Sequence, residues 1–415
     1  MRMPPAEQLP RSPESLMNRR TILLCVAAGA LVVAGIAGVS SLTGPDRSSV
    51  SVASPTPSSL PGIIINQQGD VGGGLLAVPS LAPRLPGPTL IRPTELNTGF
   101  KHTGVKLKDY RGQFGQIHDG VLTLATPGMK LEGWRIPARV EIRAADVAIR
   151  NCMVSGGEIL PASNAGLISC IHEAVRRCVI EDSLLVPERP SLWWDGVDGH
   201  DFIARRLEIY HTVDGFGVFN THNDGGPSGV EIVECFVHDL SYFSPAPRNP
   251  GDAVPHTHND CIQIHGNTGT IIHGNSLLGY IARGIGDARY TRAHPNARGG
   301  YNINDPSLAT NSVLQVTQEV SQVRGVIFDS NWCDGGGATL NISSKGGPTG
   351  NNFGSVTNNK FGRGEYFQGG SDQTNGIPGA GGDKGVVLWV RGFVLDDTSG
   401  NVYEDNGYPI MLRIE

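Results

Sequence analysis

The chain has 415 residues, a formal net charge of −6 and only 17% charged residues. There is no basic patch, which argues against nucleic acid as a partner, because such proteins neutralise phosphates with clustered lysine and arginine. With 56 glycines and 28 prolines, the composition does not favour long helices. The length does not demand several domains, since solenoids run long as one unit.

An apolar segment near the N-terminus comes first. Arg19 and Arg20 precede residues 21–42, which are uncharged and mostly small and apolar. The pattern is typical of an export signal and resembles a twin-arginine signal, but its length would also suffice for a membrane anchor. We expect residues 1–43 to be a signal peptide or an anchor. The remainder would then be secreted or held at the outer face of the cytoplasmic membrane, touching the membrane only through this segment.

Residues 44–93 are rich in proline, serine and glycine and have no apolar period, which predicts a linker. Six cysteines follow Cys25. An exported protein could oxidise some of them, and the sequence cannot choose among the pairings. Most are expected to be small buried residues stacked inside the fold.

A loose repeat begins near residue 138. Short runs of alternating β-forming residues end at a corner residue, as in TIIHGNSLL, VIFDSNWC and GSVTNNKF. Irregular periods of this kind predict an all-β fold, a single-stranded parallel β-helix, over residues 94–415. An Asn at a corner tolerates left-handed φ and can bond to the Asn of the next turn, forming a ladder. The corner marks are Asn151, Asp182, Arg206, Glu234, Asn275, Asn331, Asn359 and Asn406.

The first turns read ARVEIRAADVAIRNCMV over residues 138–154. This text, with the later repeats, resembles the right-handed parallel β-helix proteins of the pectate-lyase-like superfold, above all secreted actinobacterial members. The resemblance extends over about 95–415 and implies the fold. It leaves the activity open, because the superfold contains lyases, hydrolases, epimerases and binding proteins.

Strand alternation predicts a polar outer face. If Ile262 and Ile264 point inward, Cys261, Gln263 and His265 point outward. The same pattern recurs in two later strands, so their amides should form a column suited to hydroxyl-rich glycans. Two long insertions, 241–257 and 282–311, enter strands of this face. The expected substrate-binding residues are Gln263, His265, Gln315, Asn341, Lys345, Arg283 and Trp389.

Acids and histidines gather before the same strands. HTVDGF and HNDCIQI resemble the N-T-D-G and D-D-C-I-x-I segments of polygalacturonases, although Asn259 replaces one acid and the Gly-His-Gly and R-I-K elements do not follow. Carboxylates on neighbouring turns can split their pKa values, leaving one as acid and one as base. The expected catalytic residues are Asp214 and Asp260 as the acid/base pair, assisted by His256, His258 and His211.

The sequence leaves open whether the protein binds a metal ion. HTHND at 256–260 matches the H-x-H-x-D spacing of some zinc sites. The resemblance implies that calcium is possible, but no dense acidic cluster is present.

The expected function is an extracytoplasmic enzyme that cleaves glycosidic bonds of a polysaccharide, as a lyase or a hydrolase. The alternative is a non-catalytic cell-surface protein that binds glycans or mediates adhesion.

Overall fold

The computed structural model describes residues 90–221, 229–243, 257–281, 311–362, 387–410 and 412–415. These residues all belong to one compact unit, 88–415. Its regular structure is β apart from η1 (Lys101–Thr103), a single 3-10 turn. No helix in this part of the chain is long and apolar enough to cross a membrane. The expected signal or anchor at 1–43 lies outside the described residues.

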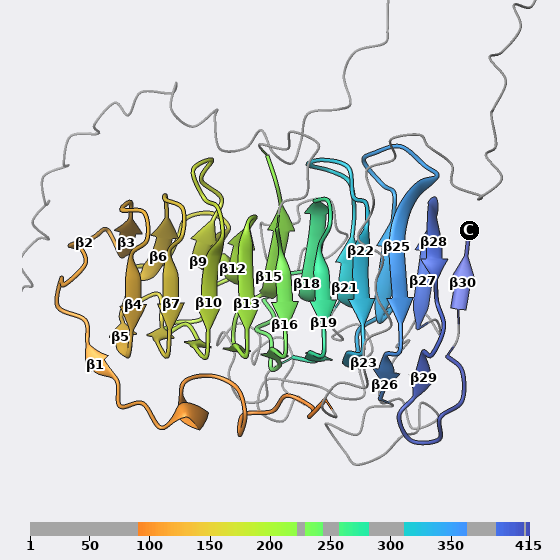
Figure 1. Ribbon diagram of the computed structural model, residues 1–415, viewed down its shortest axis with the longest axis horizontal. Coiled ribbons are helices and arrows are strands. Elements are labelled where there is room, and N and C mark those ends of the chain that lie inside the picture. The colour runs from red at the N-terminus through yellow and green to blue at the C-terminus, as the bar shows by residue number, and fades with distance from the viewer. Residues whose placement is uncertain (1–89, 222–228, 244–256, 282–310, 363–386, 411) are drawn as a thin grey trace, which may run out of the picture. The chain divides into compact units, whose positions relative to one another are not determined.

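The strands form three sheets that lie along one axis (Figure 1), and we name the sheets A, B and C. Sheet A contains β1 (Lys108–Asp109), β5 (Trp134–Ile136), β8 (Met153–Val154), β11 (Leu184–Leu185), β14 (Glu208–Ile209), β17 (Phe236–Val237), β20 (Ser276–Gly279), β23 (Trp332–Gly335), β26 (Lys360–Phe361) and β29 (Val402–Tyr403). Sheet B contains β2 (Ile117–His118), β3 (Val121–Leu124), β6 (Arg139–Ile142), β9 (Ala165–Cys170), β12 (Trp194–Gly199), β15 (Asp214–Phe219), β18 (Asp260–Gly266), β21 (Ser312–Val316), β24 (Leu340–Ser343), β27 (Leu388–Arg391) and β30 (Leu412–Ile414). Sheet C contains β4 (Lys130–Glu132), β7 (Ala148–Arg150), β10 (Cys178–Glu181), β13 (Phe202–Arg205), β16 (Glu231–Val233), β19 (Ile271–His273), β22 (Val326–Asp329), β25 (Asn351–Thr357) and β28 (Phe393–Asp397).

The chain winds in regular turns. From β4 onward it passes through sheet C, then A, then B, and each new strand pairs in parallel with the equivalent strand of the turn before. The hairpin of β2 and β3 is antiparallel. Because one turn adds one strand to each sheet, the arrangement is consistent with the expected parallel β-helix.

Inward side chains from all three sheets form one apolar core. On sheet B, Val197, Phe216, Ile262, Leu314 and Leu340 are fully buried and belong to successive turns. All six cysteines after Cys25 are free and buried, which confirms the expectation of small core residues. Burial raises the thiol pKa of these cysteines, so they stay protonated.

The corner between sheets C and A carries the predicted asparagine ladder. Asn275 Nδ2 donates to Asn331 Oδ1 at 2.9 Å, Asn331 Nδ2 to Asn359 Oδ1 at 3.0 Å, and Asn359 Nδ2 to Asn401 Oδ1 at 2.8 Å. Each acceptor oxygen also takes the backbone N–H of the preceding ladder residue. The last member is therefore Asn401, and the expectation for Asn406 was wrong.

The repeat also needs a correction of one residue in its first half. Asn151, Asp182, Arg206 and Glu234 have left-handed φ angles of 50° to 54°, and they precede the ladder position. The ladder position itself is occupied in those turns by Cys152, Ser183, Leu207 and Cys235, as the strand registers show. Two adjacent residues thus have different roles at this corner. The residue with left-handed φ turns the chain, and the ladder residue after it bonds to backbone groups inside the corner.

In β9, β18 and β21 two adjacent residues near the start of the strand face the core, and we call this feature the bend. Strict alternation would turn Cys261 outward, but it is fully buried in the core together with Ile262. In the two preceding turns the equivalent residues are Gly196 and Gly215. A Cβ on Gly215 would lie 2.7 Å from Val237 Cγ1 of sheet A and 2.4 Å from the Cys261 carbonyl oxygen. Two consecutive positions therefore face inward. Glycine occupies the first of them in two turns, while the core residues Leu167 and Val313 occupy it in others, and the expected outward direction of Cys261 was wrong.

This bend gives a prediction for stability. Gly215→Ala should lower the free energy of unfolding by about 1–3 kcal/mol, because the new methyl group overlaps sheet A and the backbone of the next turn. Gly217→Ala is the matched control, since its Cβ would meet no atom closer than 3.6 Å. Its unfolding free energy should stay within about 0.5 kcal/mol of wild type. Urea unfolding of both variants measures the difference, and equal stabilities would contradict the bend.

A segment before the first turn crosses the outer face of sheet A, and we call residues 90–107 the N-terminal strap. Arg92 pairs with Glu404 in the last turn at 3.1 Å, and β1 pairs with β5 in the first. Between them the strap is tied to the chain by the Gly99 N–H, which donates to the Arg206 carbonyl at 2.9 Å. The strap therefore spans most of the stacked turns.

Candidate functional site on the outer face of sheet B

Three acids lie at or next to the first residue of a sheet B strand in successive turns. Asp195 pairs in register with Asp214, and Asp214 Oδ1 accepts the backbone N–H of Asp260 at 2.9 Å. Asn311 Nδ2 contacts both Asp260 Oδ1, at 3.2 Å, and Gln315 Oε1, at 3.3 Å. Because Gln315 faces away from the core, Asp260 lies on the outer face as well. Asp214 and Asp260 are at most 2% exposed, although they face outward.

Beside this row of acids runs the expected column of polar side chains. Gln263 pairs in register with Gln315, Gln315 with Asn341, and Asn341 with Trp389. Asn341 Nδ2 donates to Gln315 Oε1 at 2.8 Å, so the amides also bond to one another. The alternation around these residues was predicted correctly, since their strand neighbours are buried core residues.

Asp198 belongs to the same column, two turns before Gln263. It is 4% exposed, and its Oδ2 accepts the backbone N–H of Gly166 at 2.9 Å. Its Oδ1 is buried and has no hydrogen-bond partner in the described part of the chain. Burial, and then the charge of Asp195, raise the pKa of Asp198 to about 7. Asp198 can therefore hold a proton near neutral pH.

Gly217 stands between Asp198 and Gln263 in the column. The nearest atoms to a Cβ there would be Asp198 Cβ at 3.6 Å and Phe219 Cε1 at 3.7 Å. The position is partly exposed, so the missing side chain leaves a notch next to the Asp198 Cβ, whereas the Asp198 carboxyl group points toward Gly166 of the preceding turn. A ring of a bound substrate could lie in such a notch.

The far end of the column is cationic. Trp389 faces outward between buried Leu388 and Val390, as expected. The Arg391 guanidinium lies 4.1 Å from the Trp389 ring centroid, and the Arg413 guanidinium 5.3 Å. Both cations interact with the aromatic face. The surface of sheet B thus changes from acids through amides to an arginine and tryptophan end.

His265 and Lys345, which were predicted to bind substrate, both contact Glu319. Glu319 lies 3.4 Å from His265 Nδ1 and 3.1 Å from Lys345 Nζ. The hydrogen bond with His265, followed by the contact with Lys345, lowers the pKa of Glu319 to about 2, against the effect of burial. His265 also contacts Thr317 Oγ1 at 3.0 Å. These groups form a charged border next to the amide column.

The predicted histidines divide into three cases. His258 is described and half-buried, two residues before the start of the Cys261 bend. His211 packs edge-on against Tyr210 with ring centroids 4.5 Å apart, and burial lowers its pKa to about 4. It is therefore neutral at pH 7 and lies among residues of sheet A. His256 and Arg283 lie outside the described residues.

Asn259, which stands where the polygalacturonase-like segment has an acid, has a structural role. Its Nδ2 donates to the carbonyl oxygens of Val213, at 2.9 Å, and Ser241, at 2.8 Å. Its Oδ1 accepts from Thr257 Oγ1 at 3.0 Å. These bonds fix the chain just before Asp260, so the amide positions the acid that follows it.

Within the described ranges, no group of three or more His, Cys, Asp or Glu side chains is arranged to hold a metal ion. The zinc and calcium hypotheses stay untested, because His256 of the HTHND segment is not among the residues described.

Sequence reasoning placed the acids on this face but did not assign roles to three residues. Asp198 and Gly217 occupy the same place in two segments, DGVDG and DGFGV, which align in register. That alignment was the available signal. Asn311 gave none, because its contact with Asp260 joins two segments separated by 51 positions.

No protein-family model matches the chain, and neither the curated proteins nor the solved structures contain a significant match. The class that the fold defines is an all-β protein with three parallel sheets, consistent with a parallel β-helix, and its function rests on the site.

Proposed function

We propose that the chain is an extracytoplasmic enzyme that cleaves glycosidic bonds of a polysaccharide on the outer face of sheet B. The observation that carries the proposal is Asp198, a buried carboxyl group with a pKa of about 7 in the outward column of sheet B, next to the side-chain-free position Gly217. A protonated carboxyl group at neutral pH is what a general acid needs for an oxygen leaving group.

The other acids supply the complementary base. Asp214 accepts the backbone N–H of Asp260, and Asp260 accepts a hydrogen bond from Asn311; donors of this kind stabilise the carboxylate form of an acid. Environments that separate a protonated acid from ionised neighbours define an acid/base assignment. In the proposed reaction Asp198 protonates the glycosidic oxygen, and Asp214 removes a proton from the attacking water or from the sugar carbon.

Substrate binding follows from the column. Gln263, Gln315 and Asn341 offer amide donors and acceptors about one strand spacing apart, near 4.8 Å. A glycan lying along the stacked turns would meet one amide after another. Right-handed winding, which we also propose, agrees with the strong preference of parallel crossover connections, and with the likeness to the pectate-lyase-like superfold. Export rests on residues 18–42, whose apolar pattern is typical of a signal or an anchor.

A second function has one observation in its favour. The recorded bonds of Asp198, Asp214 and Asp260 go largely to the protein itself, namely to Gly166, to the next strand and to Asn311. Such acids could order the face of a non-catalytic protein that binds glycans at the cell surface. Binding without any product would favour this alternative.

The test is to incubate the full chain with neutral and uronate-containing glycans. New reducing ends accompanied by ultraviolet absorbance of an unsaturated uronate indicate a lyase, and reducing ends alone indicate a hydrolase. Absence of product from every glycan would overturn the enzymatic proposal.

The notch provides a sharper prediction for the same assay. Gly217→Leu should lower cleavage by about 100-fold or more, because the side chain fills the space beside Asp198, as an overpacked contact of a few kcal/mol would. Gly217→Ala should retain most activity, since its methyl group fits. Initial rates of both variants, with circular dichroism to check folding, decide the matter. Full activity in Gly217→Leu would place the substrate elsewhere.

A further inference from the structure

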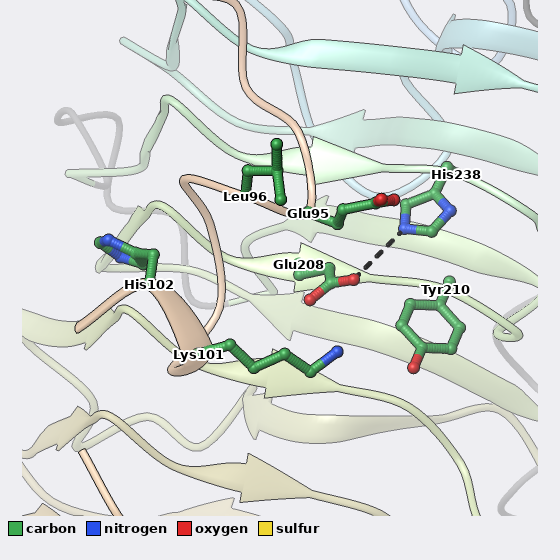
Figure 2. Close-up of a pocket in the computed structure, with 7 residues that line it drawn as sticks. All are labelled: Glu95, Leu96, Lys101, His102, Glu208, Tyr210 and His238. Carbon is green, nitrogen blue, oxygen red and sulfur yellow. Dashed lines mark ion pairs between the residues drawn. The ribbon is translucent and has the colours of Figure 1, made fainter. Parts of the chain in front are cut away.

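A pocket lies away from the outer face of sheet B, between the N-terminal strap and sheet A. Its volume is about 500 Å³, within the range of small-molecule sites. Figure 2 shows that side chains of the strap and of sheet A face one another across it. The lining residues are Glu95, Leu96, Lys101, His102, Glu208, Tyr210 and His238.

Glu208 is out of place for a purely structural residue. Its side chain is on the outer face of β14, which the N-terminal strap covers. The residues in register with it on the two neighbouring strands, Leu184 and Phe236, are apolar and also buried. Its carboxyl group is buried, with the residue 3% exposed, and Oε2 has no hydrogen-bond partner within the described ranges. Burying a carboxylate without full pairing is costly, and an apolar residue would serve packing better.

An aromatic wall stands beside this acid. The His238 ring stacks on Phe236 with centroids 4.1 Å apart and lies 5.0 Å from Tyr210. His238 Nδ1 contacts Asp239 at 2.7 Å, and its Nε2 lies 3.7 Å from Glu208 Oε1. Burial lowers the pKa of His238, but its contacts with Asp239 and Glu208 outweigh burial and leave that pKa above the usual value.

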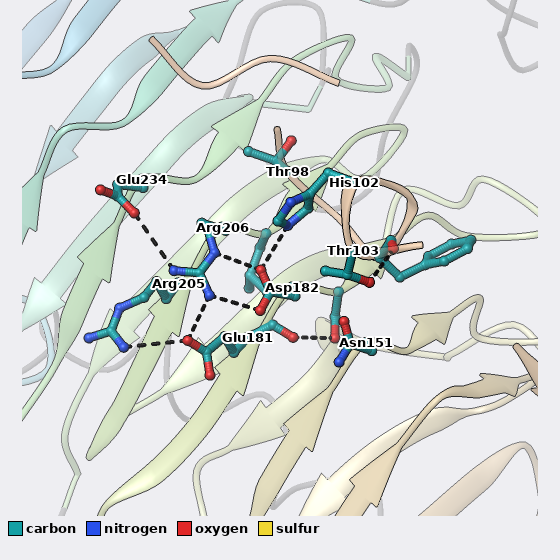
Figure 3. A network of polar contacts seen from close by, with 12 residues as sticks. Thr98, His102, Thr103, Asn151, Glu181, Asp182, Arg205, Arg206 and Glu234 are labelled. Carbon is teal, nitrogen blue, oxygen red and sulfur yellow. Dashed lines mark hydrogen bonds and ion pairs between the residues drawn. The ribbon is translucent and has the colours of Figure 1, made fainter. Parts of the chain in front are cut away.

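The strap is held firmly over the pocket. His102 Nε2 bonds to Asp182 Oδ1 at 2.8 Å, and Asp182 in turn accepts two bonds from Arg206. Arg206 also reaches Glu181 at 2.8 Å, so the network joins the strap to two turns (Figure 3). Gly99 lets the strap approach closely, because its Cβ would lie 3.0 Å from Glu208 Oε2. The cover of the pocket is thus a built feature.

We propose that this pocket binds an uncharged saccharide of one or two rings. Carboxylates on both walls, Glu95 and Glu208, accept hydroxyl groups, while Lys101 and His238 donate, and the two signs of charge leave no preference for an ionic ligand. Tyr210 and His238 line the pocket and supply aromatic surface against which a sugar ring can pack. This site is separate from the outer face of sheet B and does not rest on the function proposed there.

The experiment titrates the full chain with glucose, galactose, mannose, xylose and their disaccharides by isothermal calorimetry. At least one should bind with one site per chain, and Glu208→Gln should weaken that binding by about 10-fold or more, because a hydroxyl loses its charged acceptor. Tyr210→Ala, which removes part of the aromatic wall, should also weaken it. Tetrasaccharides of the same sugar then distinguish two natural ligands. An affinity equal to that of the short sugar indicates that the pocket binds the ends of glycan chains, and a loss of affinity indicates that it binds free sugars. Both outcomes support a saccharide site.

Two controls keep the result specific. Glu231→Gln changes an acid of sheet C and should leave the affinity unchanged. Asp198→Asn should also leave it unchanged, so that failure of the sheet B proposal stays distinguishable from failure of this one. Thermal melting confirms that Glu208→Gln is folded. No binding by any saccharide, or wild-type affinity in folded Glu208→Gln, would overturn the proposal.

Discussion

Replacing Asp198 by Asn should lower the rate of glycan cleavage by about 10²–10⁴-fold, the usual contribution of a general acid. Asn keeps a carbonyl oxygen for the Gly166 N–H but cannot release a proton to the leaving oxygen. Glycan binding, measured by calorimetry on the same variant, should change little. Asp146→Asn is the control, since that exposed acid pairs only with Arg177 in the recorded contacts and should not affect the rate.

The pH dependence adds an independent check. Because the pKa of Asp198 is raised to about 7, cleavage should fall as pH rises through 7, when the acid loses its proton. The charge of Asp195 contributes to this rise, so Asp195→Asn should move the alkaline limb to lower pH. An alkaline limb that is identical in wild type and Asp195→Asn would remove Asp198 from the acid role.

Asp198→Asn should lower the cleavage rate but should not lower stability at high pH, so a stability measurement separates an effect on function from an effect on folding. The folded pKa of Asp198 lies above the ordinary aspartate value of 3.8, so the folded state holds this proton more tightly than the unfolded one. The stabilisation is fully present below about pH 4 and is lost as pH rises through about 7. Above pH 7 the wild type contains a buried charge that Asp198→Asn lacks. The variant should therefore melt no lower than wild type at pH 8, and a marked loss of melting temperature would mean that the activity change reflects unfolding.

The second large effect is expected in the asparagine ladder. Asn331→Ala should lower the free energy of unfolding by about 3–5 kcal/mol, because it removes one side chain that bonds to four buried polar groups of three residues. Asn331 Oδ1 accepts the N–H and the Nδ2 of Asn275, and its Nδ2 donates to Ile272 O and Asn359 Oδ1. All of these groups are buried, so each orphaned group loses its partner without gaining water.

Asn406→Ala is the matched control for this measurement. Asn406 is exposed, and its Oδ1 accepts only the Tyr408 N–H in the recorded contacts. Its loss should change the unfolding free energy by no more than about 0.5 kcal/mol. Urea denaturation of the two variants compares them directly, and a similar loss in both would contradict the ladder as a source of stability.

Much of the fold could be predicted because its causes are local. The alternation around Gln263, Gln315 and Asn341 is visible in three or four residues, since an inward apolar residue must flank each outward polar one. The same holds for Trp389. The ladder positions Asn275, Asn331 and Asn359 were visible as well, because buried corner groups need a side chain that both donates and accepts.

The errors came where one position depends on a distant one. Cys261 faces inward, as Leu167 and Val313 do at the same register position of other turns, so this departure from alternation belongs to the stacked sheet and not to the local motif. Asn401 replaces Asn406 because ladder spacing is fixed by the neighbouring turn and not by the local motif.

The sequence by itself determined the all-β repeat, the apolar alternation and the gathering of acids near one face, since these follow from the need of each turn to bury one side of every strand. The tertiary structure alone decided that Asp198 is buried next to Asp195, that Gly217 leaves a notch there, and that the strap covers Glu208. Burial and the charge of neighbours set a carboxyl group's chemistry, and both depend on segments that meet only after the chain has wound.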